Sequence, residues 1–400
     1  MISARHQFFF SLLLTLTFSA VAQKNNRTAD AHCGTMPRLQ KRLDQNPLLK
    51  TKFETERTLF SQMMTQRRLL ADQAFRTQGI ISIPVVFHIV MANPDLVTDA
   101  QIQSQPDTLN KGFFGANGDS VKIPDYFKPL FGKSSIQFCL AQRTPEGEPS
   151  TGIVRKTTLT SLFSVDDAVK HTSSGGDDSW NTNAYLNVWV CGLSNGILGF
   201  ATFPDDGSPN EQGVVIDYRS LPGGSFTSYN AGKTLTHETG HYFNLYHIWG
   251  DDDGLCTGTD YVDDTPNQAG STSGNFTGIK YDACTATGNG IMYQNYMDYS
   301  YDASLVMFTT QQVARMENAL SVYRSSLLLS AGCQPVVRKA LDAQLRAINN
   351  PSQRLCGAGF TPVITLRNNG SQTLTSAIIQ TQIDNGPVTT TAWAGSLASP

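Results

Sequence analysis

The chain has 400 residues, of which 40% are hydrophobic and 16% are charged, a composition typical of a globular protein with room for two domains. Its formal net charge is −3 and it has no lysine- or arginine-rich run, which argues against nucleic acid as a partner. After the N-terminal segment no apolar stretch of about 18 residues occurs, so we expect no membrane span. The sequence does not indicate an oligomeric state.

Residues 1–22 have the features of a secretory signal peptide. Arg5 gives a basic start, an apolar stretch follows, and Ala20-Val21-Ala22 forms a small-residue cleavage site before Gln23. A buried N-terminal helix is the alternative, but it does not account for this cleavage site. We therefore expect a secreted, extracellular protein.

Residues 23–78 are predicted to form a helical pro-segment. Apolar residues recur at roughly helical spacing from Pro37 to Arg76, with basic residues between them. A break is expected near Asn46-Pro47, because proline removes a helical hydrogen bond. A charged helical segment between a signal peptide and a strand-rich region is typical of a segment that is later removed.

Residues 79–334 mix strands and helices, which indicates an α+β domain. The expected strands are 81–91, 134–143, 184–193, 198–204 and 213–221, and the expected helices are 99–114, 234–243 and 310–328. A long loop rich in glycine, aspartate and threonine covers 249–290. We expect the 198–204 segment to be an edge strand along which a substrate lies antiparallel.

Residues 335–400 change in character and alternate apolar and polar residues. Turn signals at 368–370 and 384–386 indicate hairpins, so a β-sandwich-like (immunoglobulin-like) domain is predicted. These residues are fewer than the roughly 100 of such a domain, so the prediction is of an incomplete one.

The segment His237-Glu238-Thr239-Gly240-His241 carries the clearest chemical signal. Histidines four apart share one face of a helix and can bind one metal ion, and the motif H-E-x-x-H is typical of zinc proteases. Zinc lowers the pKa of water towards neutrality, and Glu238 is placed to act as the general base that takes the proton.

The third zinc ligand is predicted to be His247. It lies six residues after His241, so the chain must leave the helix and turn back between them. Such a turn needs left-handed backbone angles, which Asn244 tolerates better than most residues. A downstream glutamate is the rival ligand, but the only glutamate after Glu238 is Glu317, in a separate predicted helix.

The segments "HETGHYFNLYHIWGD" and "NYMDYS" resemble the metzincin clan, and more closely the pappalysin (ulilysin-like) family of secreted metalloproteases. The resemblance covers about residues 80–330. It implies a twisted mixed sheet, an active-site helix and a C-terminal subdomain. It also implies that Met297 forms the Met-turn below the metal, and that Tyr299 lies beside the metal and acts in catalysis, with plain core packing as the alternative for both.

The resemblance also implies a calcium site and a disulfide in the 249–290 loop. Asp252, Asp260 and Thr265 match the calcium position best, and oxygen-rich loops suit this ion. A solvated acidic turn is the alternative. Cys256 and Cys284 resemble a family disulfide that braces the loop.

The chain has seven cysteines, so at least one has no partner within it. We expect Cys333 to pair with Cys356, and Cys139 and Cys191 to be paired or simply buried. Cys33, in "HCGTM", is then the odd one, and its surroundings resemble pro-segments of the family. Its thiolate is predicted to bind the zinc in the latent form, with a spare or paired thiol as the alternative.

The sequence therefore predicts a zinc endopeptidase made as a zymogen, which acts on protein or peptide substrates. Relatives that cut before arginine or lysine carry an acidic residue shortly after the Met-turn. Asp302 is the candidate here, although Ala303 is the other residue that fits this position. The alternatives are an exported adhesin or binding protein with a structural zinc domain, and a hydrolase of non-peptide amides.

Overall fold

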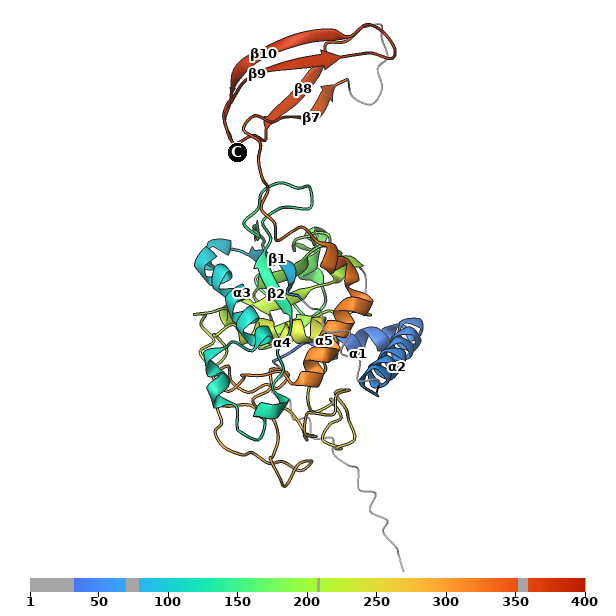
Figure 1. The fold of residues 1–400 in the computed structure, drawn as a ribbon, viewed down its shortest axis with the longest axis vertical. Helices are drawn as coiled ribbons and strands as arrows, with labels where there is room; N and C mark the ends of the chain where they lie inside the picture. Colours follow the sequence, from blue (N-terminus) through green and yellow to red (C-terminus); the bar gives the residue numbers. More distant parts are fainter. Residues whose placement is uncertain (1–31, 70–78, 207–208, 352–358, 400) are drawn as a thin grey trace, which may run out of the picture. The chain divides into compact units, whose positions relative to one another are not determined.

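The computed structural model describes residues 32–69, 79–206, 209–351 and 359–399. The predicted signal peptide, both ends of the predicted pro-segment (23–31 and 70–78) and Cys356 lie outside these ranges. Within them, no helix combines the length and hydrophobicity needed to cross a bilayer. Figure 1 shows the course of the chain.

The central element is a mixed sheet built around one long buried strand, β1 (Ile81–Met91). The other strands of this sheet are β2 (Ile136–Leu140), β3 (Ile153–Thr157), β4 (Leu186–Cys191), β5 (Gly199–Ala201) and β6 (Val214–Asp217). The order is β2-β1-β4-β6-β5, and β3 pairs with the second half of β1. All pairs are parallel except β5 with β6, so β5 is an antiparallel edge strand.

Two helices pack together beside this sheet, α3 (Asp99–Phe114) and α4 (Lys233–Tyr242) (Figure 1). α3 contacts β2, and α4 contacts β5 and β6. Phe113 of α3 packs edge-on against Phe138 of β2 and Phe243 at the end of α4. This apolar core fixes α4 against the edge strand, which is where the histidine motif lies.

A third helix, α5 (Thr310–Tyr323), lies near the end of residues 79–334, called the catalytic part after their predicted role, and continues into the 3₁₀ helix η9 (Ser325–Leu329). Thr309 and Gln312 form a capping box at its start, which satisfies otherwise unpaired N–H groups. After η9, Cys333 forms a disulfide with Cys139 of β2. The expected Cys333–Cys356 pair is therefore wrong.

The predicted pro-segment contains two helices, α1 (Thr35–Gln45) and α2 (Pro47–Leu69). The break falls at Asn46, immediately before Pro47, as the sequence predicts. Leu39 and Leu43 of α1 and Phe53 of α2 are buried in a small cluster with Phe203 and Tyr246 of the catalytic part. The pro-segment is therefore folded, and its apolar face is covered by the domain that it precedes.

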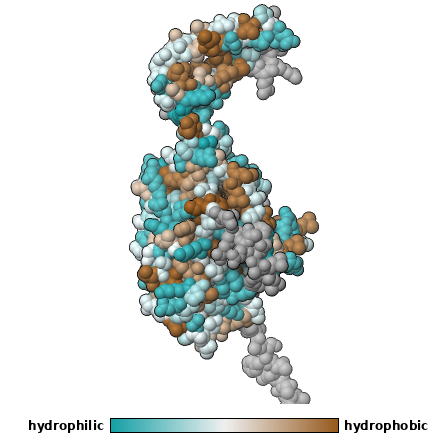
Figure 2. Space-filling view, in the orientation of Figure 1, coloured by the Kyte–Doolittle hydropathy of each residue, from teal (hydrophilic) through white to brown (hydrophobic). Residues whose placement is uncertain are grey.

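The C-terminal residues form two antiparallel two-stranded sheets, β7 (Ala343–Asn350) with β8 (Val363–Asn368), and β9 (Leu374–Thr381) with β10 (Thr389–Leu397). Several apolar side chains on them are exposed, among them Ile348 and Ile378, and Figure 2 shows hydrophobic residues gathered on these strands. The predicted β-sandwich stays a prediction.

Candidate active site

The three histidines converge on one point. His237 and His241 lie one turn apart on α4, and their Nε2 atoms are 3.2 Å apart. The chain leaves the helix, turns back at Asn244, and brings Nε2 of His247 to 3.2 Å from Nε2 of His241. Asn244 has φ +74°, the left-handed conformation that the sequence predicts for this turn.

The other nitrogen of each ring is anchored. Nδ1 of His237 lies 2.7 Å from the Tyr296 carbonyl oxygen, and Nδ1 of His241 lies 2.7 Å from that of Leu245. Since a carbonyl only accepts, Nδ1 carries the proton in both rings and Nε2 carries a lone pair. Burial lowers the pKa of His237 to about 3 and that of His241 well below its usual value, so both rings are neutral.

The third ring is held by a residue that the sequence analysis did not single out for this role. Nδ1 of His247 lies 2.8 Å from a carboxylate oxygen of Asp251, which follows it by one turn. Trp249 stacks on the same ring, with centroids 4.2 Å apart and an interplanar angle of 8°. These contacts fix the orientation of an imidazole that lies outside the helix.

The donor set fits zinc. Tetrahedral zinc–nitrogen bonds of about 2.05 Å place neighbouring nitrogens about 3.3 Å apart, close to the two measured separations. The Sγ atom of Cys33 lies near the three rings, and all four candidate donor atoms are within 4.8 Å of one another. Imidazole nitrogen and thiolate sulfur are both preferred zinc ligands, and here the thiol comes from the pro-segment.

Glu238 lies beside this cluster and is covered by the pro-segment. Its Oε2 accepts hydrogen bonds from Thr35 Oγ1 at 2.8 Å and from Cys33 Sγ at 3.5 Å. Burial raises the pKa of Glu238 to about 8, and the two hydrogen bonds oppose that shift. Gly199 of β5 leaves room for this side chain, because a Cβ there would lie 2.8 Å from Glu238 Cγ. Neither Thr35 nor Gly199 was predicted.

Met297 and Tyr299 both lie at the site. Met297 is fully buried below α4, and a Cβ on Gly240 would meet its Sδ at 2.6 Å, so the glycine of the motif permits this close contact. The hydroxyl of Tyr299 is 3.2 Å from Nε2 of His247. Burial raises the pKa of Tyr299 well above its usual value, so the phenol keeps its proton and can donate a hydrogen bond.

Asn244 does more than tolerate a turn. Arg315 of α5, which is 1% exposed, donates from Nε to the Asn244 backbone oxygen at 2.7 Å and from Nη2 to the side-chain oxygen. A glycine would adopt the same backbone angles but could not accept the second hydrogen bond. The asparagine therefore ties the turn before His247 to α5.

The variant Asn244→Gly should keep the turn and its hydrolytic activity, but lower the free energy of unfolding by about 1–3 kcal/mol, since a buried guanidinium loses a partner. Denaturant unfolding measures this change. Asn195→Gly is the matched control, because Asn195 also has positive φ (+58°) but lies exposed. Equal stability of the two variants would show that the Arg315 hydrogen bond contributes nothing.

The first described residues of the pro-segment run along the edge strand. The backbone N–H of Leu198 donates to the His32 oxygen at 2.7 Å, and the N–H of Gly34 donates to the Gly199 oxygen at 2.8 Å. Cys33 pairs with Gly199 in a parallel bridge. The segment therefore occupies the strand edge expected for a substrate, but it runs parallel to β5.

Asp302 lines a small pocket beside His237 and Glu238. Its Oδ2 accepts a hydrogen bond from the Ala231 N–H at 2.7 Å, whereas its buried Oδ1 has no hydrogen-bond partner among the described residues. Burial raises the pKa of this carboxyl to about 6. The alternative residue, Ala303, instead presents its carbonyl oxygen to Lys122.

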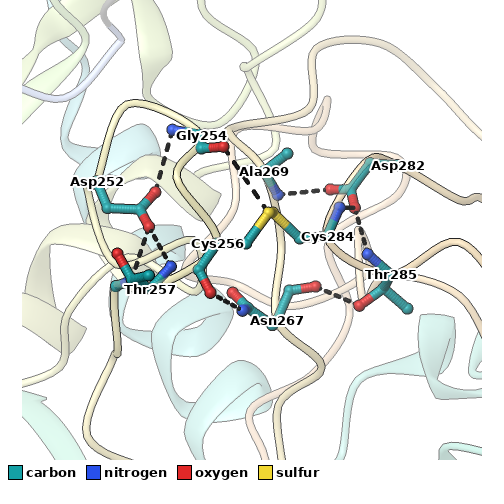
Figure 3. The surroundings of a disulfide bond; sticks show 10 residues. Asp252, Gly254, Cys256, Thr257, Asn267, Ala269, Asp282, Cys284 and Thr285 are labelled. Atoms are coloured by element: carbon teal, nitrogen blue, oxygen red, sulfur yellow. Dashed lines mark hydrogen bonds between the residues drawn. A yellow bond between two sulfur atoms is a disulfide. The ribbon is translucent and has the colours of Figure 1, made fainter.

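The 249–290 loop is braced by the Cys256–Cys284 disulfide that the family resemblance implies (Figure 3). Asp252 accepts hydrogen bonds from the N–H groups of Gly254, Thr257 and Gly258, which shape the turn before Cys256. Asp260 instead accepts from the Thr265 hydroxyl at 2.8 Å. The calcium site at Asp252, Asp260 and Thr265 stays a prediction.

Three converging imidazoles, two of them on a helix beside the edge strand, together with a buried glutamate on that helix define the active site of a metalloprotease. The peptidase family M43, described as pregnancy-associated plasma protein-A, matches residues 171–321. An extracellular metalloprotease of Neurospora crassa is 34% identical over 271 residues, which are 64% of this chain and 81% of that protein. The chain belongs to this family, the pappalysins, and is a metalloendopeptidase.

Solved structures of metalloproteases are also similar to this chain. Mature mirolysin of Tannerella forsythia, in complex with a cleaved peptide, is 43% identical with a TM-score of 0.59, covering 63% of this chain and 99% of that one. A mutant of promirolysin from the same organism is 38% identical with a TM-score of 0.67, covering 74% and 97%. Membership of an enzyme family argues against the alternative of a binding protein.

Proposed function

We propose that the protein is a secreted zinc endopeptidase, made as a zymogen, in which His237, His241 and His247 hold the metal. The observation that carries this proposal is the convergence of three Nε2 atoms, with His241 Nε2 lying 3.2 Å from each of the other two, which matches tetrahedral zinc. Two disulfides among the described residues and the names of the extracellular relatives support export. Zinc bound there would supply Lewis-acid activation of water and of the substrate carbonyl.

Glu238 is the proton-transfer group in this proposal. Its side chain lines the same pocket as His237, where its carboxylate would take a proton from the attacking water and return it to the leaving amine. Tyr299, whose hydroxyl lies next to His247, donates a hydrogen bond to the oxygen that becomes negative in the transition state. Met297 supports α4 from below and takes no part in proton transfer.

The pro-segment supports latency in three ways. It presents the Cys33 thiol where a fourth zinc ligand would lie, it covers Glu238 through Thr35, and it occupies the edge of β5. Without the metal, burial raises the pKa of Cys33 well above its usual value. A bound zinc ion reverses this preference, because a coordinating thiol loses its proton.

Asp302 supports a preference for arginine or lysine after the scissile bond. An unpartnered carboxylate oxygen in a pocket beside the catalytic cluster favours a side chain that brings both a positive charge and hydrogen-bond donors. Lys233 is the nearest cation, but its Nζ is already bound to Asp119 and to the carbonyl oxygens of Asp302 and Leu305.

Calcium binding by Asp252, Asp260 and Thr265 is a lesser part of the proposal. Burial raises the pKa of Asp260 to about 7, and a hard cation would favour its ionised form. Metal analysis of the purified protein measures the number of calcium ions and the number of zinc ions bound per chain.

A peptide-library digest tests the proposal and its specificity. The mature enzyme should cleave before arginine or lysine, and a zinc chelator should abolish all cleavage. The variant Asp302→Asn, which keeps the shape of the side chain, should lower kcat/KM for arginine relative to its neutral isostere citrulline at that position by about 10–100-fold.

Asp125→Asn is the matched control variant, because the side chain of Asp125 is 92% exposed. Cleavage that survives complete zinc removal would contradict the zinc mechanism. An unchanged arginine-to-citrulline ratio in Asp302→Asn would contradict only the assignment of the pocket.

A further inference from the structure

A second group of buried charges lies where α1 meets the catalytic part. Arg38, 3% exposed, donates from Nε and Nη2 to Asp167 Oδ2 at 3.0 and 2.6 Å, and from Nη1 to Asp206. Arg42, one turn later, binds Asp206 at 2.9 Å and Glu211 at 3.0 Å. Both arginines belong to the pro-segment, and all three acids belong to the catalytic part.

The charges of this cluster balance only while the pro-segment is present. The catalytic part supplies three carboxylates and one ammonium group, Lys170, whose Nζ lies 2.8 Å from Asp167 Oδ1. Burial lowers the pKa of Lys170 to about 8, so it stays cationic at neutral pH. Removal of Arg38 and Arg42 therefore leaves two uncompensated negative charges (three minus one). His171 borders Glu211 at 3.5 Å and adds charge only when protonated.

Three neighbouring carboxylates with one ammonium group carry a local negative charge, so the vacated cluster attracts a new cation. The shape of the site indicates which cation. Asp167 receives two donors of one guanidinium and Asp206 receives the third, an arrangement that matches the planar fork of arginine. The pro-segment thus shows the ligand that the site accepts.

The cluster lies along the path of the substrate. The pro-segment passes Leu198 and Gly199 at the zinc cluster, and Thr35 Oγ1 then accepts a hydrogen bond from the Ala201 N–H. Asp206 comes after the C-terminal end of β5 in the sequence, which is the end towards which the pro-segment runs. A substrate antiparallel to β5 has its residues before the scissile bond at this end of the strand. From Cys33 the chain advances two extended residues at about 3.3 Å each and then three residues of α1 at about 1.5 Å each to Arg38, about 11 Å in all. This length equals about three residues of an extended substrate, so the site of Arg38 corresponds to about two to four residues before that bond.

We propose that Asp167 and Asp206 form a second specificity site of the mature enzyme, which binds an arginine or lysine side chain two to four residues before the scissile bond. Arg38 fills this site in the zymogen and vacates it on activation. This inference rests on the proposed endopeptidase function. It makes the enzyme selective for substrates with basic residues on both sides of the cleaved bond.

The test uses the full chain after activation and removal of the pro-segment. Peptides of one sequence carry either arginine or citrulline at the second, third or fourth position before the scissile bond, and kcat/KM is measured for each pair. We expect arginine to be favoured by about tenfold or more at one of these positions. Asp206→Asn should bring that ratio towards one, whereas Asp125→Asn should leave it unchanged.

Equal kcat/KM for arginine and citrulline at all three positions in the wild-type enzyme would overturn the proposal, and would assign the cluster to anchoring of the pro-segment alone. This comparison needs no variant, so a folding defect of Asp206→Asn does not remove the test. A preserved ratio in folded Asp206→Asn also counts against the proposal. In both cases peptides are still cleaved, whereas absence of all cleavage would contradict the endopeptidase function itself.

Discussion

The Glu238→Ala variant should lose peptide hydrolysis by at least about 10²–10⁴-fold and keep its metal. Alanine has no group that can take a proton from water or return it to the leaving amine. The three imidazoles are oriented by hydrogen bonds to Tyr296, Leu245 and Asp251, whereas Glu238 is hydrogen-bonded to Thr35 and Cys33. Turnover of a fluorogenic peptide and zinc content per chain measure the two effects separately.

Two further variants make this result specific. Glu238→Gln preserves the volume of the side chain and should be as inactive as Glu238→Ala, because an amide cannot act as the base. Glu146→Ala, at an exposed position, should retain wild-type turnover. Substantial hydrolysis by zinc-loaded Glu238→Gln would assign proton transfer to another group.

The Cys33→Ala variant should make the unprocessed chain active, with hydrolysis at least about tenfold above that of unprocessed wild type. The thiol is the only donor that the described pro-segment residues contribute to the histidine cluster. Arg38 and Thr35 would still hold the segment in place, so activity below that of the mature enzyme is expected. Initial rates of hydrolysis of a fluorogenic peptide measure this effect. Electrophoresis of the protein in the same samples shows that it is still unprocessed.

Cys191→Ala is the matched control for that experiment. Cys191 is also a free, buried cysteine, but it packs in a separate apolar cluster on the sheet with Phe163 and Trp189. Its replacement should leave latency intact. If unprocessed Cys33→Ala is as silent as wild type, the thiol does not block the metal, and the Arg38 and Thr35 contacts alone account for latency.

Local patterns predicted much of the fold. The break before Pro47 follows from the geometry of proline, and β1 follows from a run of apolar residues long enough to be buried on both faces. β3 was not predicted, because "IVRKT" is short and carries two cations. The strand predicted at 213–221 ends earlier in the structure, as β6 (Val214–Asp217). It ends there because the Asp217 side chain accepts a hydrogen bond from the Arg219 N–H and caps a 3₁₀ helix.

The site was predictable where its parts are close in sequence. His237, His241 and Glu238 share one helix, and Asn244 explains how His247 returns to them. The partners from distant segments were not predictable. Thr35 reaches Glu238 across 203 residues, and Cys139 pairs with Cys333 across 194. Such contacts depend on how the strands are ordered, which no local periodicity specifies.

The segment His32–Thr35 runs parallel to β5, which is opposite to the direction expected of a substrate. A peptide that lies backwards in a protease cleft presents its bonds in reverse, with the nitrogen of each bond on the side meant for the carbonyl. In the proposed mechanism, Glu238 would then have no correctly placed leaving amine to protonate. Under the proposed mechanism, the segment His32–Thr35 would therefore resist cleavage for as long as it stays in this orientation.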